Sequence, residues 1–334
     1  MIPRPEILPP TDDALTRAAE LLRAGELVAF PTETVYGLGA DAANEQALEA
    51  IFTAKGRPRF NPLIVHVSCL EAAETIGVFD DRARVLAQCL WAGPFTAVVP
   101  RKADAPVSPL VSAGLDTVAL RVPGNRVAQA LLREFGGPIA APSANRSGRI
   151  SPTTPMHVAT DLGDRVAMIL AGGRCEVGLE STIVDLSVDP PRLLRPGRIA
   201  RRSIEGLIGP ISAPEDDADH SGLATIAPKA PGQLLSHYAP QLPVRLNAAT
   251  VGPTEALLAF GPDRFVRGGA TRLNLSPEGD LLEAAANLYA MLHRLDQPGY
   301  SAIAVMPIPE QSIGIAINDR LRRAAAPRTL SITP

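Results

Sequence analysis

The residues best suited to chemistry in this sequence are cations and small polar groups collected in a few short segments. The first segment reads Lys55-Gly-Arg-Pro-Arg-Phe-Asn-Pro62 and combines a lysine with two arginines. A compact ammonium and planar guanidinium groups together suit the oxygens of a phosphate. Only three of the 32 basic residues are lysines (Lys55, Lys102 and Lys229), so a lysine here is unusual for this chain. Cations are also common at helix C-termini, so these residues alone leave anion binding and a solvated charge equally open.

Small polar residues form two further candidate segments. In Pro142-Ser-Ala-Asn-Arg-Ser-Gly148, the Ser143 hydroxyl and the Asn145 amide lie among small residues that let a ligand approach the backbone. An ordinary turn rich in serine and asparagine is the alternative. In residues 31–39, two threonines and a tyrosine alternate, so they can project from one side of an extended chain. An edge strand explains that alternation equally well.

Two arginines are embedded in apolar strand-like segments. Arg121 lies in Val-Ala-Leu-Arg-Val, and Arg195 lies between Leu194 and Pro196. A buried charge needs a partner or a charged ligand, so both arginines favour a site for an anion. His66 lies in Leu-Ile-Val-His-Val, where a single histidine is more often an ordinary core residue.

Several common catalytic and metal-binding motifs are absent. The chain has neither a G-x-x-x-x-G-K-[ST] phosphate loop nor a G-x-S-x-G nucleophile elbow. The histidines have no metal-site spacing, so we expect no protein metal site. They are His66, His157, His220, His237 and His293. Gly37-Leu-Gly39 begins a match to G-x-G-x-x-A, but it lies too far from the preceding strand, and we interpret it as a turn.

Hydrophobic periodicity and capping residues predict the elements that position these groups. Helices are expected at 11–23, 44–54, 70–76, 81–90, 127–135, 154–162, 199–208, 278–295 and 317–326. Strands are expected at 27–30, 63–67, 96–99, 118–122, 138–141, 166–170, 181–186, 192–194, 243–246, 256–260, 271–275 and 302–306. Residues 31–39 are expected to form a polar loop. The irregular order predicts an α/β fold whose sheet contains some antiparallel pairs.

Length and local composition predict two domains. A chain of 334 residues is longer than a domain with a single hydrophobic core usually is. Residues 209–240 are rich in proline and contain an acidic run, which is typical of a long linker or a lid. We therefore expect a larger domain at 1–208, a linker at 209–240 and a small α/β domain at 241–334.

Composition narrows the cellular setting and the possible partners. The net charge of −3 and the aromatic content of 4% argue against strong direct binding of nucleic acid. Cys69, Cys89 and Cys175 form no C-x-x-C pair, which favours a reducing compartment. The first residues have no apolar signal core, and no apolar stretch reaches membrane length. We expect a soluble cytoplasmic protein.

The joint pattern resembles one enzyme family. Lys55-Gly-Arg57, Ser143-Ala-Asn145, the run PTETVYGLG at 31–39 and SHYAP at 236–240 are similar to the threonylcarbamoyl-AMP synthases in their long two-domain form, with an N-terminal YrdC-like domain. The resemblance implies a twisted mixed sheet with a concave cationic face. It also implies that L-threonine, bicarbonate (or CO2) and ATP give threonylcarbamoyl-AMP and pyrophosphate. A separate transferase then uses the product to modify an adenosine of tRNA.

The resemblance also implies roles for individual residues. Those expected around threonine are Thr34, His66, Arg121, Ala141 and Ser181. Those expected around ATP are Arg57, Asn61, Thr117, Ser143, Asn145, Ser151, Arg195 and, from the linker, Tyr238. Lys55 and Arg57 are expected to act in catalysis at the anionic centre. Mg²⁺ is expected to arrive on the ATP phosphates, and the linker is expected to close over the site.

Three alternatives remain to be weighed. A carbamoyl-adenylate-forming enzyme of hydrogenase maturation uses a similar core, but those proteins carry paired C-x-x-C segments that this chain lacks. An RNA-binding translation module conflicts with the charge balance and the few aromatic residues. An α/β domain without catalysis leaves the embedded arginines unexplained.

Overall fold

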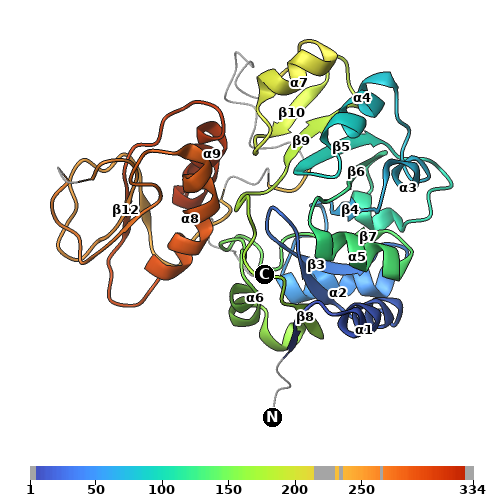
Figure 1. Ribbon diagram of the computed structural model, residues 1–334, viewed down its shortest axis with the longest axis horizontal. Coiled ribbons are helices and arrows are strands. Elements are labelled where there is room, and N and C mark those ends of the chain that lie inside the picture. Colours follow the sequence, from blue (N-terminus) through green and yellow to red (C-terminus); the bar gives the residue numbers. More distant parts are fainter. Residues whose placement is uncertain (1–4, 214–229, 233–235, 264–265, 328–334) are drawn as a thin grey trace, which may run out of the picture.

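Two sheets organise the part of the chain that the computed structural model describes, namely residues 5–213, 230–232, 236–263 and 266–327 (Figure 1). The first is a mixed ten-stranded sheet and the second a parallel four-stranded sheet. The predicted mixed α/β sheet with a smaller second α/β domain is therefore confirmed. The helices within the described residues are too short or too polar to cross a membrane.

The large sheet has the strand order β1-β8-β2-β3-β7-β4-β6-β5-β9-β10. Its strands are β1 (Glu6–Leu8), β2 (Val28–Pro31), β3 (Tyr36–Asp41), β4 (Ile64–His66), β5 (Phe95–Pro100), β6 (Thr117–Arg121), β7 (Ile139–Ala140), β8 (Met168–Leu170), β9 (Thr182–Asp185) and β10 (Arg192–Arg195). Its helices are α1 (Asp12–Arg23), α2 (Glu45–Lys55), α3 (Leu70–Glu74), α4 (Asp81–Leu90), α5 (Arg126–Phe135), α6 (Pro155–Asp161) and α7 (Arg201–Ile208), with 3₁₀ turns at Pro109–Ser112 and Gly163–Arg165.

Alternation along the central strands separates a core face from a polar face. Val65 of β4 and Leu120 of β6 belong to the main hydrophobic core, together with residues of α2 and α4. Successive strand residues point to opposite faces, so Ile64 and Ala119 lie on the other side, in a much smaller cluster. The parallel register of β4 and β6 pairs His66 with Arg121. The polar groups at these strand ends therefore lie side by side.

Capping residues place the cationic segment. The Asn44 side chain accepts hydrogen bonds from two backbone N–H groups in the first turn of α2. The helix ends at Gly56, whose φ of 58° is left-handed and favours glycine. Lys55 is thus the last helical residue, and Arg57 begins the loop that leads to β4.

The prediction of a loop at 31–39 with a turn at Gly37–Gly39 is wrong for its second half. Tyr36 begins β3, which runs antiparallel to β2 and pairs Phe30 with Gly37. A Cβ at Gly39 would come 2.8 Å from a ring carbon of Phe30, so glycine lets that ring cross the strand. Gly37 and Gly39 have no side chains, so this segment lacks the alternation of polar and apolar side chains by which a strand is recognised. The short edge strand β1 was also missed.

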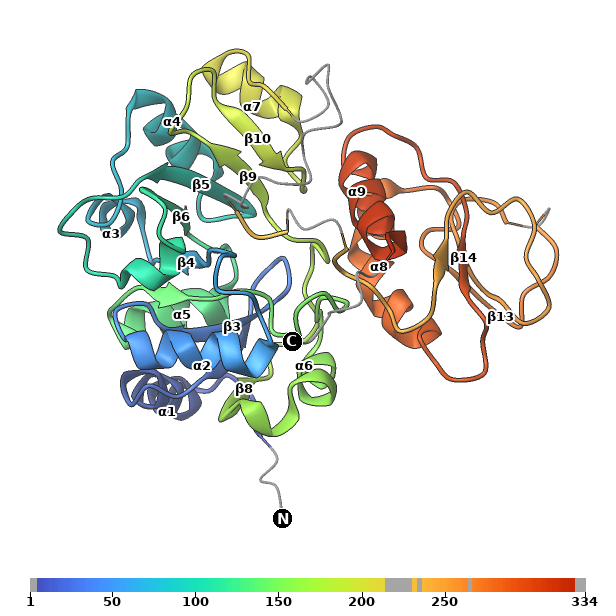
Figure 2. The same ribbon diagram turned by 180° about the vertical axis from the view of Figure 1, so that it is seen from behind.

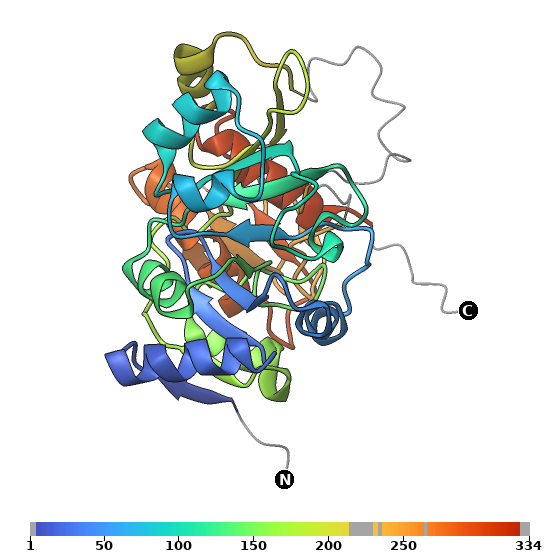
Figure 3. The same cartoon turned by 90° about the vertical axis from the view of Figure 1, so that its right-hand side faces the viewer.

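The second sheet belongs to the C-terminal part of the chain. Its strands β11 (Val244–Arg245), β12 (Ala256–Ala259), β13 (Thr271–Asn274) and β14 (Ile303–Val305) have the order β11-β14-β12-β13. Helices α8 (Leu281–Leu295) and α9 (Gly314–Ala325) lie between this sheet and the first domain (Figures 1 and 2). In Figure 3 the second domain stands behind the first.

The predicted domain limits stay a proposal. Part of the predicted linker, residues 214–229 and 233–235, lies outside the described residues. Ser212 forms a bridge with Arg192 of β10, and Ile211 joins the core of the first domain, so the start of that segment packs on the larger domain.

Candidate active site

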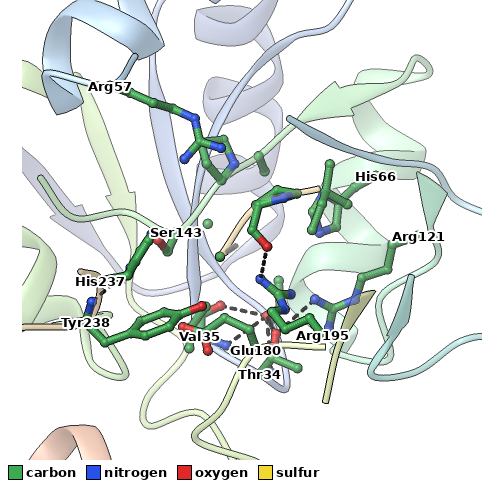
Figure 4. A pocket seen from close by; sticks show the side chains of 17 residues that line it. Thr34, Val35, Arg57, His66, Arg121, Ser143, Glu180, Arg195, His237 and Tyr238 are labelled. Atoms are coloured by element: carbon green, nitrogen blue, oxygen red, sulfur yellow. Dashed lines mark hydrogen bonds between the residues drawn. The ribbon is translucent and has the colours of Figure 1, made fainter. Parts of the chain in front are cut away.

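A pocket of about 520 Å³, including its solvent-open part, lies on the polar face of the large sheet (Figure 4). Eight predicted site residues line it, namely Thr34, Arg57, His66, Arg121, Ala141, Ser143, Arg195 and Tyr238. The other residues that line it are Thr32, Val35, Gly37, Ile64, Pro142, Glu180, Pro231, Gly232 and His237. Segments far apart in the sequence thus bring three buried arginines to one cavity.

At one end of the pocket, Arg121 is fixed by three acceptors. Its Nε donates to the carbonyl oxygen of Gly93 (3.2 Å) and its Nη1 to the hydroxyl of Thr34 (3.0 Å). Its Nη2 donates to Oε1 of Glu33 at 2.5 Å, in a buried ion pair. The other oxygen of Glu33 accepts the N–H of Gly124. Sequence reasoning predicted a partner or a ligand for Arg121 but did not single out Glu33, although it adjoins Thr34.

His66 presents a neutral imidazole beside Arg121. Burial, and next the charge of Arg121, lower the pKa of His66 to about 3. Its Nδ1 is buried and has no hydrogen-bond partner among the described residues. The ring meets Phe30 edge-on at a centroid distance of 6.3 Å. An uncharged ring with a free nitrogen can bind a ligand without adding charge.

Arg57 borders the opposite end of the pocket. It donates from Nε to the carbonyl oxygen of Asn61 (3.2 Å) and from Nη2 to that of Pro62 (2.8 Å). Burial lowers the pKa of Arg57 to about 10, which leaves it charged at neutral pH. Both polar atoms of the Asn61 side chain are buried without a partner among the described residues. Burial of an unpaired amide costs free energy of folding unless a ligand completes its hydrogen bonds.

Lys55 supports the pocket wall and does not line the cavity. Its buried Nζ donates to the carbonyl oxygens of Ser143 and Asn145, each at 2.5 Å. Burial, and next the charge of Arg57, hold the pKa of Lys55 well below its ordinary value. The Asn145 amide donates to two carbonyls of its own loop, while its buried Oδ1 has no partner among the described residues.

Arg195 joins several strand ends. Its Nε and Nη2 donate to the carbonyl and hydroxyl oxygens of Ser181, both at 3.1 Å, and its Nη1 donates to Pro231 O at 3.2 Å. The Ser181 hydroxyl also lies 2.7 Å from that of Thr96. Ser181 is therefore placed by Arg195. Thr117 lies at the start of β6, at the far end of that strand from Arg121, and does not line the pocket.

Glu180 is a buried carboxylate in the pocket wall that sequence reasoning missed. It accepts hydrogen bonds from Ser151 (2.6 Å), Tyr289 (2.9 Å) and Arg320 (2.8 Å). Burial alone raises the pKa of Glu180, but Arg320 and Arg195 outweigh it and lower the pKa to about 2. Two of these donors lie in the second domain, more than 100 positions away, so no local spacing in the sequence could reveal them.

Tyr238 closes one side of the pocket from the predicted linker. Its φ of 61° is left-handed, and its N–H donates to Nδ1 of His237 (2.9 Å). Its hydroxyl is buried and has no partner among the described residues. Burial lowers the pKa of His237 to about 3, so this ring is also neutral.

This arrangement is that of an α/β enzyme that binds a charged small molecule between buried arginines and neutral hydroxyl, amide and imidazole groups. Within the described residues, no group of three or more histidines, cysteines or carboxylates is arranged to hold a metal ion.

Comparisons with known proteins identify the family. A family model described as "Telomere recombination" matches residues 20–197, and one described as "Threonylcarbamoyl-AMP synthase, C-terminal domain" matches residues 199–326. The chain is 40% identical to the threonylcarbamoyl-AMP synthase of Bacillus subtilis (96% of this chain, 95% of the relative) and 38% identical to that of Pyrococcus abyssi (94% and 95%). The crystal structure of P. abyssi Sua5 complexed with L-threonine matches with a TM-score of 0.86 at 36% identity, over 96% of each chain. The chain belongs to the threonylcarbamoyl-AMP synthase family, a family of nucleotidyltransferase-type enzymes. The resemblance seen in the sequence is confirmed, and the three alternative functions lose their support.

Proposed function

We propose that this enzyme converts L-threonine, bicarbonate (or CO2) and ATP into threonylcarbamoyl-AMP and pyrophosphate. The observation that supports this most is that Arg57, Arg121 and Arg195, from distant segments, line one pocket together with neutral polar groups. Two anionic reactants meet in this reaction. A cationic pocket offsets their mutual repulsion.

Threonine occupies the Arg121 end in this proposal. The Arg121 guanidinium attracts the carboxylate of the amino acid, and Glu33 holds the guanidinium in place and limits its net charge. Neutral His66 and the hydroxyls of Thr34 and Ser181 suit the polar groups of threonine. The methyl group of Ala141 leaves room beside them.

ATP extends from Arg57, at the other end of the pocket, to Arg195, which also holds Ser181 of the proposed threonine set. The unpaired amide of Asn61 offers a donor and an acceptor, as the edge of a purine base requires. The free hydroxyl of Tyr238 and the Oδ1 of Asn145 add further unpaired groups. Ser143 and Ser151 belong to the same proposed set. Thr117 is kept in the set on the resemblance alone, since it lies outside the pocket lining at the start of β6.

The chemistry needs charge compensation and little water. The unprotonated amine of threonine adds to CO2 and its nitrogen releases one proton to water, which leaves an anionic carbamate. An oxygen of this carbamate attacks the α-phosphorus of ATP as pyrophosphate leaves. Arg57 and Arg195 stabilise the added charge, and Lys55 holds the wall that faces it. Because the carbamate and the mixed anhydride both decompose in water, closure by the linker through His237 and Tyr238 protects them.

Mg²⁺ fits this site as a companion of ATP. The one carboxylate among the described lining residues is Glu180, and Ser151, Tyr289 and Arg320 already occupy its oxygens. Bound to the phosphates, Mg²⁺ would neutralise part of their negative charge. The protein's own cations act on the remaining oxygens.

The product is a reactive mixed anhydride, so a second enzyme must use it as a substrate. In this proposal a separate transferase, in the cytoplasm, uses it to modify an adenosine of tRNA. This chain needs no strong contact with tRNA itself, in keeping with its net charge of −3.

Pyrophosphate release tests the proposal. Threonine, bicarbonate and ATP are each omitted in turn, and the product is identified by mass spectrometry. Release that requires all three, with the mass of threonylcarbamoyl-AMP, is expected. Pyrophosphate release that continues without threonine contradicts the proposal, and serine in place of threonine measures how strict the amino-acid pocket is.

A further inference from the structure

Arg320, on α9 of the second domain, reaches into the wall of the active site. It is 1% exposed and carries its charge into the boundary between the two domains. Its Nε donates to Oε2 of Glu180 (2.8 Å) and its Nη2 to the carbonyl oxygen of Pro196 (3.0 Å). Its Nη1 donates to Asp319, its neighbour on the helix, at 2.5 Å. Every nitrogen of the guanidinium is therefore engaged, and two of them bind the first domain.

The same guanidinium packs on the linker. Its central carbon lies 5.1 Å from the centre of the Tyr238 ring, within the range of a cation–π contact. Tyr289 of α8 stacks on the same ring at a centroid distance of 5.9 Å and donates its hydroxyl to Glu180. The second domain thus fixes both the carboxylate and the aromatic ring.

These contacts fall on one half of the site. Pro196 follows Arg195, Glu180 binds Ser151, and Tyr238 comes from the linker, so all three neighbours belong to the proposed ATP half. In the threonine half, by contrast, the hydrogen bonds of Arg121 end on Gly93, Thr34 and Glu33, all in the first domain. Ser181 is held by Arg195 and Thr96, which also belong to the first domain.

We propose that Arg320 is a positioning residue for ATP, through which the second domain shapes the nucleotide half of the active site. The inference rests on the proposed function, because it takes Arg195, Ser151 and Tyr238 as the ATP groups. A purely stabilising role would not explain this ion pair, because apolar residues can often replace a buried ion pair without loss of folding stability. The planar fork of arginine, however, fixes two acceptors of the first domain and the Tyr238 ring in a single geometry.

Coupling of this kind is reciprocal. If docking of the second domain orders the ATP groups, then ATP binding must strengthen the docking by the same factor. ATP is therefore expected to slow hydrogen exchange in α9, while threonine alone leaves it unchanged. A helix that responds equally to both ligands contradicts the proposal.

The decisive experiment compares Arg320→Met with Arg322→Met on the same helix. Arg322 is an exposed residue paired with Glu310, so its variant controls for loss of an arginine from α9. Arg320→Met is expected to raise the Kd and KM for ATP at least about tenfold, because the loss of one charged hydrogen bond weakens binding by about that factor. The Kd for threonine and kcat at saturating ATP should change less than about threefold, and Arg322→Met should match the wild type. An unchanged Kd for ATP in a folded Arg320→Met protein, or equal losses for ATP and threonine, overturns the proposal.

Milder variants keep the test decisive if Arg320→Met does not fold. Arg320→Lys keeps the charge but loses the fork, and Tyr289→Phe keeps the ring but loses one donor to Glu180. Each is expected to weaken ATP binding selectively, by about threefold or more. Calorimetry measures ATP binding without turnover, so absence of threonylcarbamoyl-AMP synthesis by the wild type counts against the proposed function and not against Arg320.

Discussion

The Nζ of Lys55 lies 2.5 Å from the carbonyl oxygen of Ser143, 88 positions further along the chain. Ser143 lines the pocket and Lys55 does not, so the lysine contacts the wall of the pocket and not the cavity itself. The left-handed Gly56 that ends α2 positions the lysine for this contact. One buried lysine side chain therefore joins the cationic segment to the small polar segment recognised in the sequence.

Replacement of Lys55 by alanine is expected to lower turnover about a hundredfold, because a shift of about 1 Å in the groups that position a substrate can have an effect of that size. The substitution leaves two carbonyl oxygens unpaired and frees the wall to move away from the phosphates. Steady-state pyrophosphate release measures the effect, and circular dichroism confirms folding. Lys102→Ala removes a lysine outside the pocket lining and serves as the control. Wild-type turnover in folded Lys55→Ala contradicts the supporting role.

Arg121→Met is expected to destabilise the protein by about 3–5 kcal/mol, because it leaves Glu33 buried without its counter-charge. The double variant Glu33→Gln, Arg121→Met removes both charges and should recover part of that loss. Urea denaturation at pH 7.5 measures the free energy of unfolding of each protein. If the double variant is no more stable than Arg121→Met, the destabilisation has another cause.

The sequence predicted the elements well where local signals determine them. The helix expected at 44–54 lies within one residue of α2 at each end. Arg121 and Arg195 pointed to a charged site because apolar strands rarely carry unpaired charges. These signals are local, and each can be read from a few neighbouring residues.

What could not be predicted depends on long-range partners. Glu33 meets Arg121 across 88 positions, and Glu180 meets Arg320 across 140, with no pattern in the sequence to connect them. Strand β3 was missed because glycines replace the side chains that show alternation. Lys55 was expected to act at the anionic centre, and nothing in the sequence indicated that its Nζ would bind the carbonyl oxygens of Ser143 and Asn145.

Tyr238→Phe is expected to raise the KM for ATP about five- to tenfold, the value of one hydrogen bond of about 1 kcal/mol. The hydroxyl has no partner among the described residues, so its loss leaves the ring contacts intact and removes one group offered to the nucleotide. Kinetics with ATP varied at saturating threonine measures the change. If the KM for ATP does not change, the Tyr238 hydroxyl makes no hydrogen bond to ATP.

Tyr238→Ala removes the ring as well and opens the pocket to water. More pyrophosphate should then be released per threonylcarbamoyl-AMP formed, because the carbamate and the mixed anhydride meet solvent. The ratio of the two products measures this uncoupling. A ratio equal to that of Tyr238→Phe contradicts a role of the linker in excluding water.

Stability is expected to fall as the pH drops below about 6.5. Burial lowers the pKa of His66 and of His237 to about 3, whereas the unfolded chain takes up these protons near pH 6.5. Below pH 6.5 the unfolded state therefore binds more protons than the folded state, and each histidine costs up to about 1.4 kcal/mol per pH unit. Glu180, with its pKa lowered to about 2, adds to the loss only below its ordinary value of 4.5, so the histidines dominate between pH 6.5 and 5. Urea denaturation across this window measures the slope, and His237→Asn should flatten it. A slope that His237→Asn leaves unchanged shows that this imidazole is not buried in its neutral form.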